Sequence, residues 1–268
     1  MTVSPARVLA LLRKEWLDMR GTLAPWLPGL LMIPVIALPF VFAVVVPRLA
    51  GEPLEQSDFA EHIDAVRRAW PALSALSPRA AVQVFVFQQF MTLVLLVPVS
   101  GAMSLAAYGV IGERQGRTLE PLLATPMTSV EFLLAKVVAA WLPAMALGLL
   151  TTALYLGVVA VVAEPGVIQA LLSVRTALLV LLGGPLLAAV ALQMVVLAST
   201  RAKDPRSAQQ VGVFVVLPMV GVLVAQGTGA FWLTVPAILG VSAVLALLWL
   251  ALLGLSVAVF EPERMLSW

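Results

Sequence analysis

Few residues in this sequence are suited to covalent or metal chemistry. The chain has no cysteine and a single histidine, His62, so it offers neither a thiolate nor a histidine cluster for a metal site. An ATP-binding loop of the Walker type needs a lysine directly after glycine-rich turns. None of the lysines, Lys14, Lys136 and Lys203, stands in such a context. We therefore predict that the chain is not an enzyme by itself, binds no metal and carries no cofactor of its own.

Ionisable side chains are nearly absent inside the apolar stretches, and the remaining polar ones include Gln88, Gln89 and Gln193. Such side chains usually serve hydrogen bonding between neighbouring helices in a membrane. Lining a transport route is the alternative use. We name the three glutamines as candidate pathway residues and keep both interpretations.

The richest segment for function runs from Gly112 to Lys136, between two long apolar stretches. Thr118 can cap a helix start, Pro121 is tolerated in a first helical turn, and Pro126 disfavours helix at the residue before it. This spacing predicts a short helix over residues 119–124.

A second and longer helix is predicted to begin after this short one. Thr128 and Glu131 have the spacing of a capping box, in which each side chain bonds the backbone N–H of the other residue. The short helix itself would carry an apolar knob of Leu119, Leu122 and Leu123 within a charged rim. Such a knob suits a groove on a partner protein or lipid headgroups.

At these residues the chain resembles the permease subunits of type-2 ABC exporters. The family's loop reads as an acidic residue, a basic residue, Gly-x-Thr-Leu-Glu, two leucines and Thr-Pro. The pattern is carried here by Glu113, Arg114, Gly116, Thr118, Leu119, Glu120, Leu122, Leu123, Thr125 and Pro126. The resemblance implies that the loop at 112–130 contacts a separate ABC ATPase subunit, which would hold ATP and Mg²⁺. A solvated connection between helices is the plain alternative.

Composition places the chain in the membrane. Hydrophobic residues make up 62% of the sequence and charged residues only 11%, which leaves too little polar surface for a soluble domain. The net charge of +2 is too small to indicate nucleic acid as a partner. The lipid bilayer is therefore the expected surrounding.

Residues 1–22 are predicted to form an amphipathic helix in the membrane interface, like the elbow helix of the resembled family. Its predicted apolar side is made of Val8, Leu9, Leu12, Trp16 and Met19, and most charges lie opposite. Glu15 and Leu17 depart from this division. The alternative is an extension of the first membrane span.

Residues 23–268 are predicted to form one all-α transmembrane domain. A helix needs about 20 residues to cross the hydrocarbon core, and six apolar stretches meet this length, at about 25–46, 81–110, 131–162, 174–199, 209–226 and 232–257. The fifth is short, so a re-entrant hairpin is its alternative. Prolines inside the spans predict kinks at Pro98, Pro143, Pro185 and Pro218. Lys136 and Arg175 are near enough to span ends to extend outward.

Basic residues orient the bundle, because cytoplasmic loops are enriched in lysine and arginine. One side holds Arg7, Arg13, Lys14, Arg20, Arg114, Arg117, Lys136, Arg201, Lys203, Arg206 and Arg264. The other side holds Arg48, Arg67, Arg68, Arg79 and Arg175. We therefore predict a multi-pass protein of the cell membrane with both termini cytoplasmic and residues 47–80 as an external loop.

The loop Ser199 to Gln210 also resembles the family, through its basic residues, Asp204-Pro205 and two glutamines. Asp204-Pro205 is a turn or helix-start signal. Taken together, the resemblance implies an ATP-driven exporter permease that pairs with an ATPase subunit and with a second permease copy, identical or related. A secondary carrier and a membrane assembly subunit without transport are the alternatives. A carrier would need a buried ionisable residue at mid-membrane, and an intramembrane enzyme would need clustered catalytic side chains; the sequence predicts neither. The substrate stays open.

Overall fold

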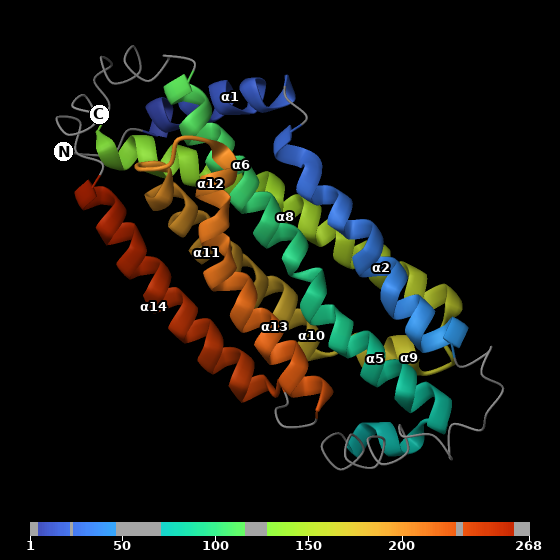
Figure 1. Ribbon diagram of the computed structural model, residues 1–268. Helices are drawn as coiled ribbons and strands as arrows, with labels where there is room; N and C mark the ends of the chain where they lie inside the picture. Colours follow the sequence, from blue (N-terminus) through green and yellow to red (C-terminus); the bar gives the residue numbers. More distant parts are fainter. Residues whose placement is uncertain (1–4, 22–23, 47–70, 116–127, 229–232, 260–268) are drawn as a thin grey trace.

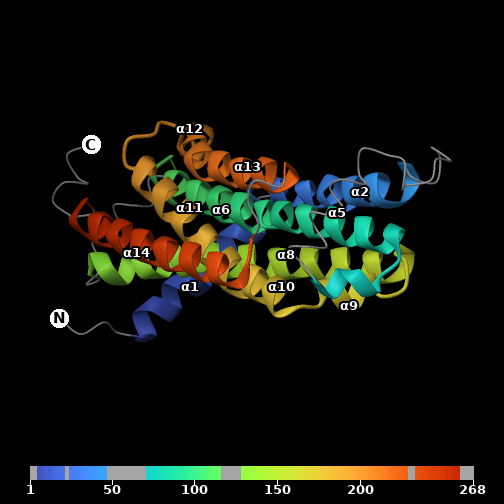
Figure 2. The same cartoon turned by 90° about the horizontal axis from the view of Figure 1, so that it is seen from below.

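The computed structural model describes residues 5–21, 24–46, 71–115, 128–228 and 233–259. Within these ranges all regular structure is helical, and the helices form an elongated bundle (Figures 1 and 2). The first half comprises α1 (Pro5–Arg20), the 3₁₀ helix η1 (Ala24–Leu31), α2 (Met32–Phe40), the π-helix η2 (Val41–Val45), the 3₁₀ helix η4 (Pro71–Ala75), α5 (Pro78–Val94) and α6 (Leu96–Gln115). The second half comprises α8 (Ser129–Val162), α9 (Val167–Leu171), α10 (Val174–Leu178), the π-helix η5 (Leu179–Gly183), α11 (Gly184–Ser199), α12 (Pro205–Gln209), the 3₁₀ helix η6 (Gln210–Gly212), α13 (Val213–Gly227) and α14 (Val235–Val259).

Six helical stretches of the described residues are long and apolar enough to cross a membrane. They are Trp26–Val45, Pro78–Gly112, Val130–Val162, Val174–Ser199, Pro205–Gly227 and Val235–Val259. These limits lie within a few residues of the predicted spans, so the prediction of an all-α polytopic membrane protein is confirmed. The fifth stretch has 23 residues, which is enough to cross the hydrocarbon core unaided.

Proline position explains where the long stretches change geometry. Pro98 has no N–H for the carbonyl four residues earlier, and its ring crowds that carbonyl. That earlier residue is Val94, where α5 ends before α6 resumes at Leu96. Pro185 stands in the first turn of α11, directly after the π-helical turn η5. By contrast, α8 and α13 continue through Pro143 and Pro218 without interruption.

The core of the bundle lies along α5 and α6, which are largely buried, whereas α14 is mostly exposed. Small residues let α6 approach α8 closely: a Cβ added at Gly101 would lie 3.6 Å from the Cβ of Ala144. A Cβ added at Gly148 would lie only 2.8 Å from the Pro98 ring. Close packing through small residues is a usual way to join helices in lipid, where no hydrophobic force drives association. The pair α6 and α8 therefore forms a tightly packed unit.

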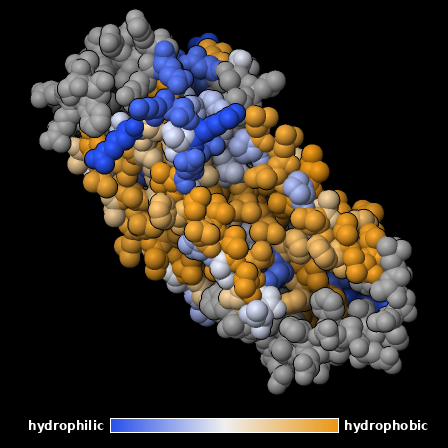
Figure 3. Space-filling view, in the orientation of Figure 1, coloured by the Kyte–Doolittle hydropathy of each residue, from blue (hydrophilic) through white to orange (hydrophobic). Residues whose placement is uncertain are grey.

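The first helix is separate from the first span. α1 ends at Arg20, and Figure 1 shows it crossing one end of the bundle while α2 runs along the bundle. α1 and α2 are therefore separate helices that run in different directions. Hydrophilic residues gather at this same end in Figure 3, above a wide hydrophobic middle region. Exposed apolar side chains of the spans, such as Leu247 and Phe214, suit contact with lipid tails.

Candidate functional site

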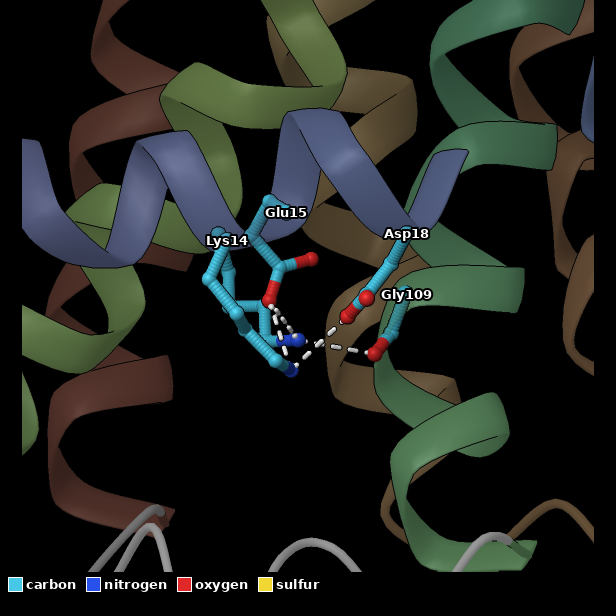
Figure 4. Close-up of polar contacts among 5 residues, drawn as sticks. Lys14, Glu15, Asp18 and Gly109 are labelled. Carbon is cyan, nitrogen blue, oxygen red and sulfur yellow. Dashed lines mark hydrogen bonds and ion pairs between the residues drawn. The ribbon is translucent and has the colours of Figure 1, made fainter. Parts of the chain in front are cut away.

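Three helices meet at the polar end of the bundle, and we call this place the α1–α6–α8 junction. It consists of Lys14, Glu15, Asp18, the carbonyl of Gly109 and Lys136 (Figure 4). α6 ends at Gln115 and α8 begins at Ser129. The junction therefore lies near the end of α6 and the start of α8.

Lys136 is the centre of the junction. Its Nζ donates to Glu15 Oε1 at 2.7 Å and to the carbonyl oxygen of Gly109 at 2.8 Å. The side chains of Lys136 and Glu15 are 3% and 6% exposed, so water does not screen the attraction as it does at a surface. The ammonium also lies 5.6 Å from the ring centroid of Phe132, within the range of a cation–π contact. One lysine on α8 thus holds both α1 and α6.

Lys14 forms the outer part of the junction. Its Nζ lies 3.1 Å from Asp18 Oδ2 and 3.5 Å from Glu15 Oε1. Asp18 is mostly exposed, and an exposed pair of this kind contributes about 0–1 kcal/mol. The buried pair of Glu15 with Lys136 therefore determines how α1 is seated.

The start of α8 carries the predicted capping box. Thr128 N–H donates to Glu131 Oε2 at 2.9 Å, and Glu131 N–H donates to Thr128 Oγ1 at 3.2 Å, so this prediction is confirmed. The Glu131 side chain is fully buried, and Arg7 Nη1 lies 3.6 Å from its Oε2. The helix dipole also stabilises a carboxylate at a helix N-terminus. α1 is thus joined to α8 by a second ion pair, at the very turn where α8 begins.

The second loop of interest comes to the same end of the bundle. Asp204 caps α12, since its Oδ1 accepts from Ser207 N–H at 2.9 Å, which confirms the helix-start signal. This backbone hydrogen bond is the main cause that lowers the pKa of Asp204. α12 packs against α6, and Gln115 Nε2 donates to the carbonyl of Lys203 at 3.4 Å. The loop Ser199 to Gln210 therefore contacts the end of α6, the helix from which segment 112–130 continues.

The sequence matches one known protein family over most of its length. The family described as "ABC-2 family transporter protein" matches residues 70–231, which is more than half of the chain. The chain belongs to the ABC-2 transporter family. No curated protein and no solved structure matches it.

Membership makes the chain a permease subunit of a type-2 ABC transporter, a multi-pass membrane protein that associates with an ABC ATPase subunit. The matched region extends from the start of the second span through the fifth. It includes both loops on which the resemblance rested.

The predicted ATPase-coupling residues of the permease lie at the edge of the described structure or beyond it. Gly116, Thr118, Leu119, Glu120, Leu122, Leu123, Thr125 and Pro126 lie outside the described residues. Glu113 and Arg114 belong to the last turn of α6, and their side chains are also outside the description. Their role in coupling therefore stays a prediction.

Two basic side chains near span ends are buried, contrary to our expectation. We expected Lys136 and Arg175 to extend outward from span ends, but both are buried. α1 lies over Lys136 and supplies Glu15, so the ammonium is neutralised inside the junction rather than in water. Arg175 is 9% exposed within α10, where neighbouring helices enclose it.

Glu15 is the residue of the junction that sequence reasoning missed. Its signal was its departure from the amphipathic pattern of α1, because an acidic residue lay on the side expected to be apolar. Among the α1 side chains that the structure describes, Leu11 and Glu15 are buried, while Leu9 and Trp16 are exposed. The predicted apolar side thus divides into a face packed on the bundle and a face open to its surroundings.

The three candidate pathway glutamines each connect two helices. Gln88 Oε1 accepts from Thr176 Oγ1 at 3.3 Å, between α5 and α10. Gln89 Nε2 donates to the Leu223 carbonyl, between α5 and α13. Gln193 Nε2 donates to Ser256 Oγ, between α11 and α14. These contacts give each amide a packing role, and a role in the transport route stays a prediction.

Two further amides, which the sequence analysis did not single out, also tie α5 to its neighbours. Gln83 accepts from Glu164 N–H at 2.7 Å and donates to the Ala43 carbonyl at 3.5 Å. Gln226 Nε2 donates to Thr92 Oγ1 at 3.3 Å. Their positions in apolar stretches were visible in the sequence, but their partners were not. α5 is therefore the helix from which hydrogen bonds reach the first, fourth and fifth spans.

Proposed function

We propose that this permease exports a substrate by alternating access and is driven by a separate ATPase subunit that contacts segment 112–130. ATP and Mg²⁺ would be held by that subunit, since no lysine of the chain stands in a Walker context. The observation that carries the proposal is the close packing of α6 and α8, the two helices that this segment connects along the chain. Lys136 also joins both helices to α1.

The proposed mechanism follows from the connection of segment 112–130 to α6 and α8. Closure of the ATPase subunits on ATP would displace segment 112–130, and the displacement would pass into α6 and α8 together because they pack as one unit. α6 continues from α5, so movement of α6 would reach the helix that hydrogen bonds several other spans. A second permease copy, identical or related, would supply the other half of the route.

The proposed orientation places the junction in the cytoplasm of the cell, together with both termini. Among the described residues, Arg7, Arg13, Lys14, Lys203 and Arg206 belong to helices and turns at the junction end. Arg79 and Arg175 belong to elements at the opposite end. An excess of basic residues on one side is the usual mark of the cytoplasmic face.

The test compares the loss of apolar side chains in segment 112–130 with the loss or reversal of a charge in the same segment. Truncating a well-packed interface anchor costs about 2 kcal/mol or more, whereas an exposed ion pair is worth about 0–1 kcal/mol. Leu122→Ala with Leu123→Ala should therefore weaken co-purification with the ATPase subunit more than Glu120→Ala does. Glu120→Lys should mainly lower transport per ATP hydrolysed, because it introduces repulsion.

The measurements are pull-down of the ATPase subunit and transport in vesicles for each variant. Normal assembly and normal transport in both the double-alanine variant and Glu120→Lys would refute coupling through this segment. Transport by the permease alone, without ATPase subunit or ATP, would favour the secondary carrier instead.

A further inference from the structure

We propose that Lys136 is a positioning residue for coupling: with Glu15 it fixes the spacing of the ends of α6 and α8 on which segment 112–130 is mounted. The inference rests on the proposed function, because it assigns the residue that holds the coupling segment's base. It concerns only the buried contact of Lys136 with Glu15 and Gly109.

Lys136 and Gly109 lie at similar distances from the ends of their helices. Lys136 comes seven residues after Ser129, and Gly109 comes six residues before Gln115. At a rise of about 1.5 Å per residue, both positions lie about 10 Å from the ends of their helices. Lys136 thus joins α6 and α8 directly below the two points where the segment leaves them.

The ammonium joins three helices through two short, buried hydrogen bonds. Its carboxylate partner belongs to α1, its carbonyl partner belongs to α6, and its own backbone belongs to α8. Charge-assisted hydrogen bonds are shorter and stronger than those between neutral groups. Rotation of α8 about its axis, or sliding along α6, would break at least one of these bonds. The contact therefore selects one register of α6 against α8.

Stability alone does not account for a buried ion pair at this place. Removing two charges from water is costly, and apolar side chains of similar volume are often equally stabilising or more so. α6 and α8 already pack closely further along, at Gly101 with Ala144 and at Gly148 with Pro98. The best-supported use of a buried polar pair is to specify register. The charged pair therefore specifies the register of α6 against α8, two helices that close packing already holds together.

A second contact supports the same arrangement. Arg7 reaches Glu131 in the first turn of α8, so α1 contacts α8 at two places separated by five residues of α8. Two contacts fix the direction of α1 as well as its position. α1 thereby holds the start of α8 in place through two ion pairs. At Lys136 the same contact also includes α6.

The test measures the spacing directly. Gly112→Cys and Val130→Cys provide labelling sites near the two helix ends, since a side chain at Gly112 meets no atom within 4 Å and Val130 is exposed. The chain has no cysteine of its own, so spin labels at these sites report one distance. We expect Glu15→Gln with Lys136→Met to shift or broaden that distance relative to the labelled wild type. Lys14→Met, which removes the partly exposed lysine of the same junction, should leave it unchanged.

Function is measured on the full complex with the ATPase subunit in vesicles. The double variant should assemble and hydrolyse ATP, and its transport per ATP should fall about 5-fold or more, the scale of a typical coupling energy between sites. If the double variant does not fold, Lys136→Arg keeps the cation with a longer, planar head group and should shift the same distance. Wild-type distances in the double variant, or in Lys136→Arg when that variant replaces it, overturn the inference. An altered distance with wild-type transport per ATP also overturns the inference, because the spacing would then not serve coupling; coupling through segment 112–130 itself is tested separately by the Leu122, Leu123 and Glu120 variants.

Discussion

Gly148 on α8 offers a direct test of how closely α6 and α8 are packed. An alanine Cβ at this position would lie 2.8 Å from both the Cβ and the Cγ of Pro98. Carbon atoms that are not bonded rarely approach within 3.4 Å, and the proline ring is fixed to its backbone, so it cannot rotate away. Gly148→Ala therefore forces the two helices apart.

The magnitude follows from two opposing effects. Replacing glycine by alanine inside a helix gains about 1 kcal/mol, and forcing an extra carbon into a packed core costs about 1–3 kcal/mol. Gly157 is the matched control, because it lies on the same helix and a Cβ there meets no atom within 4 Å. Gly157→Ala should keep the gain without the cost. The two variants should therefore differ by about 1–3 kcal/mol, with Gly148→Ala the less stable.

The assay is the midpoint of thermal or denaturant unfolding of the purified permease in detergent, followed by tryptophan fluorescence. Both variants carry the same chemical change on the same helix, so effects of detergent on alanine itself largely cancel. Equal midpoints for the two variants would refute the close approach of α8 to Pro98. They would also weaken the argument that α6 and α8 move as one unit.

Two further predictions concern the route and the orientation. If Gln88, Gln89 and Gln193 line the route, changing each to leucine should alter substrate-stimulated ATP hydrolysis of the complex while assembly is kept; a change in detergent stability alone would support the packing role that their hydrogen bonds suggest. For orientation, Gln56→Cys should react with an impermeant thiol reagent in intact cells and Gln115→Cys should not, because basic residues concentrate on the cytoplasmic side. External labelling of Gln115→Cys would reverse the proposed topology.

The sequence alone was sufficient where the governing interactions are local. Six spans could be predicted because the thickness of the hydrocarbon core sets a minimum length that apolar stretches either meet or fail to meet. The cap of α8 by Thr128 and Glu131, and the cap of α12 by Asp204, could be predicted because their partners lie three residues apart. The interruption at Pro98 agrees with the missing N–H of proline, although Pro143 and Pro218 lack the same N–H and leave α8 and α13 continuous. The family resemblance likewise rested on contiguous residues.

The tertiary structure decided which side chains meet across helices. Glu15 and Lys136 are separated by 121 positions in the chain, and neither residue's local pattern reveals the other. Periodicity indicates which face of a helix is apolar, but not which helix covers that face. This is why Lys136 was expected to extend outward and is instead buried beneath α1. The same holds for Gln89 and Leu223, 134 positions apart: a buried amide must find a partner, but only the packing of the bundle determines which one.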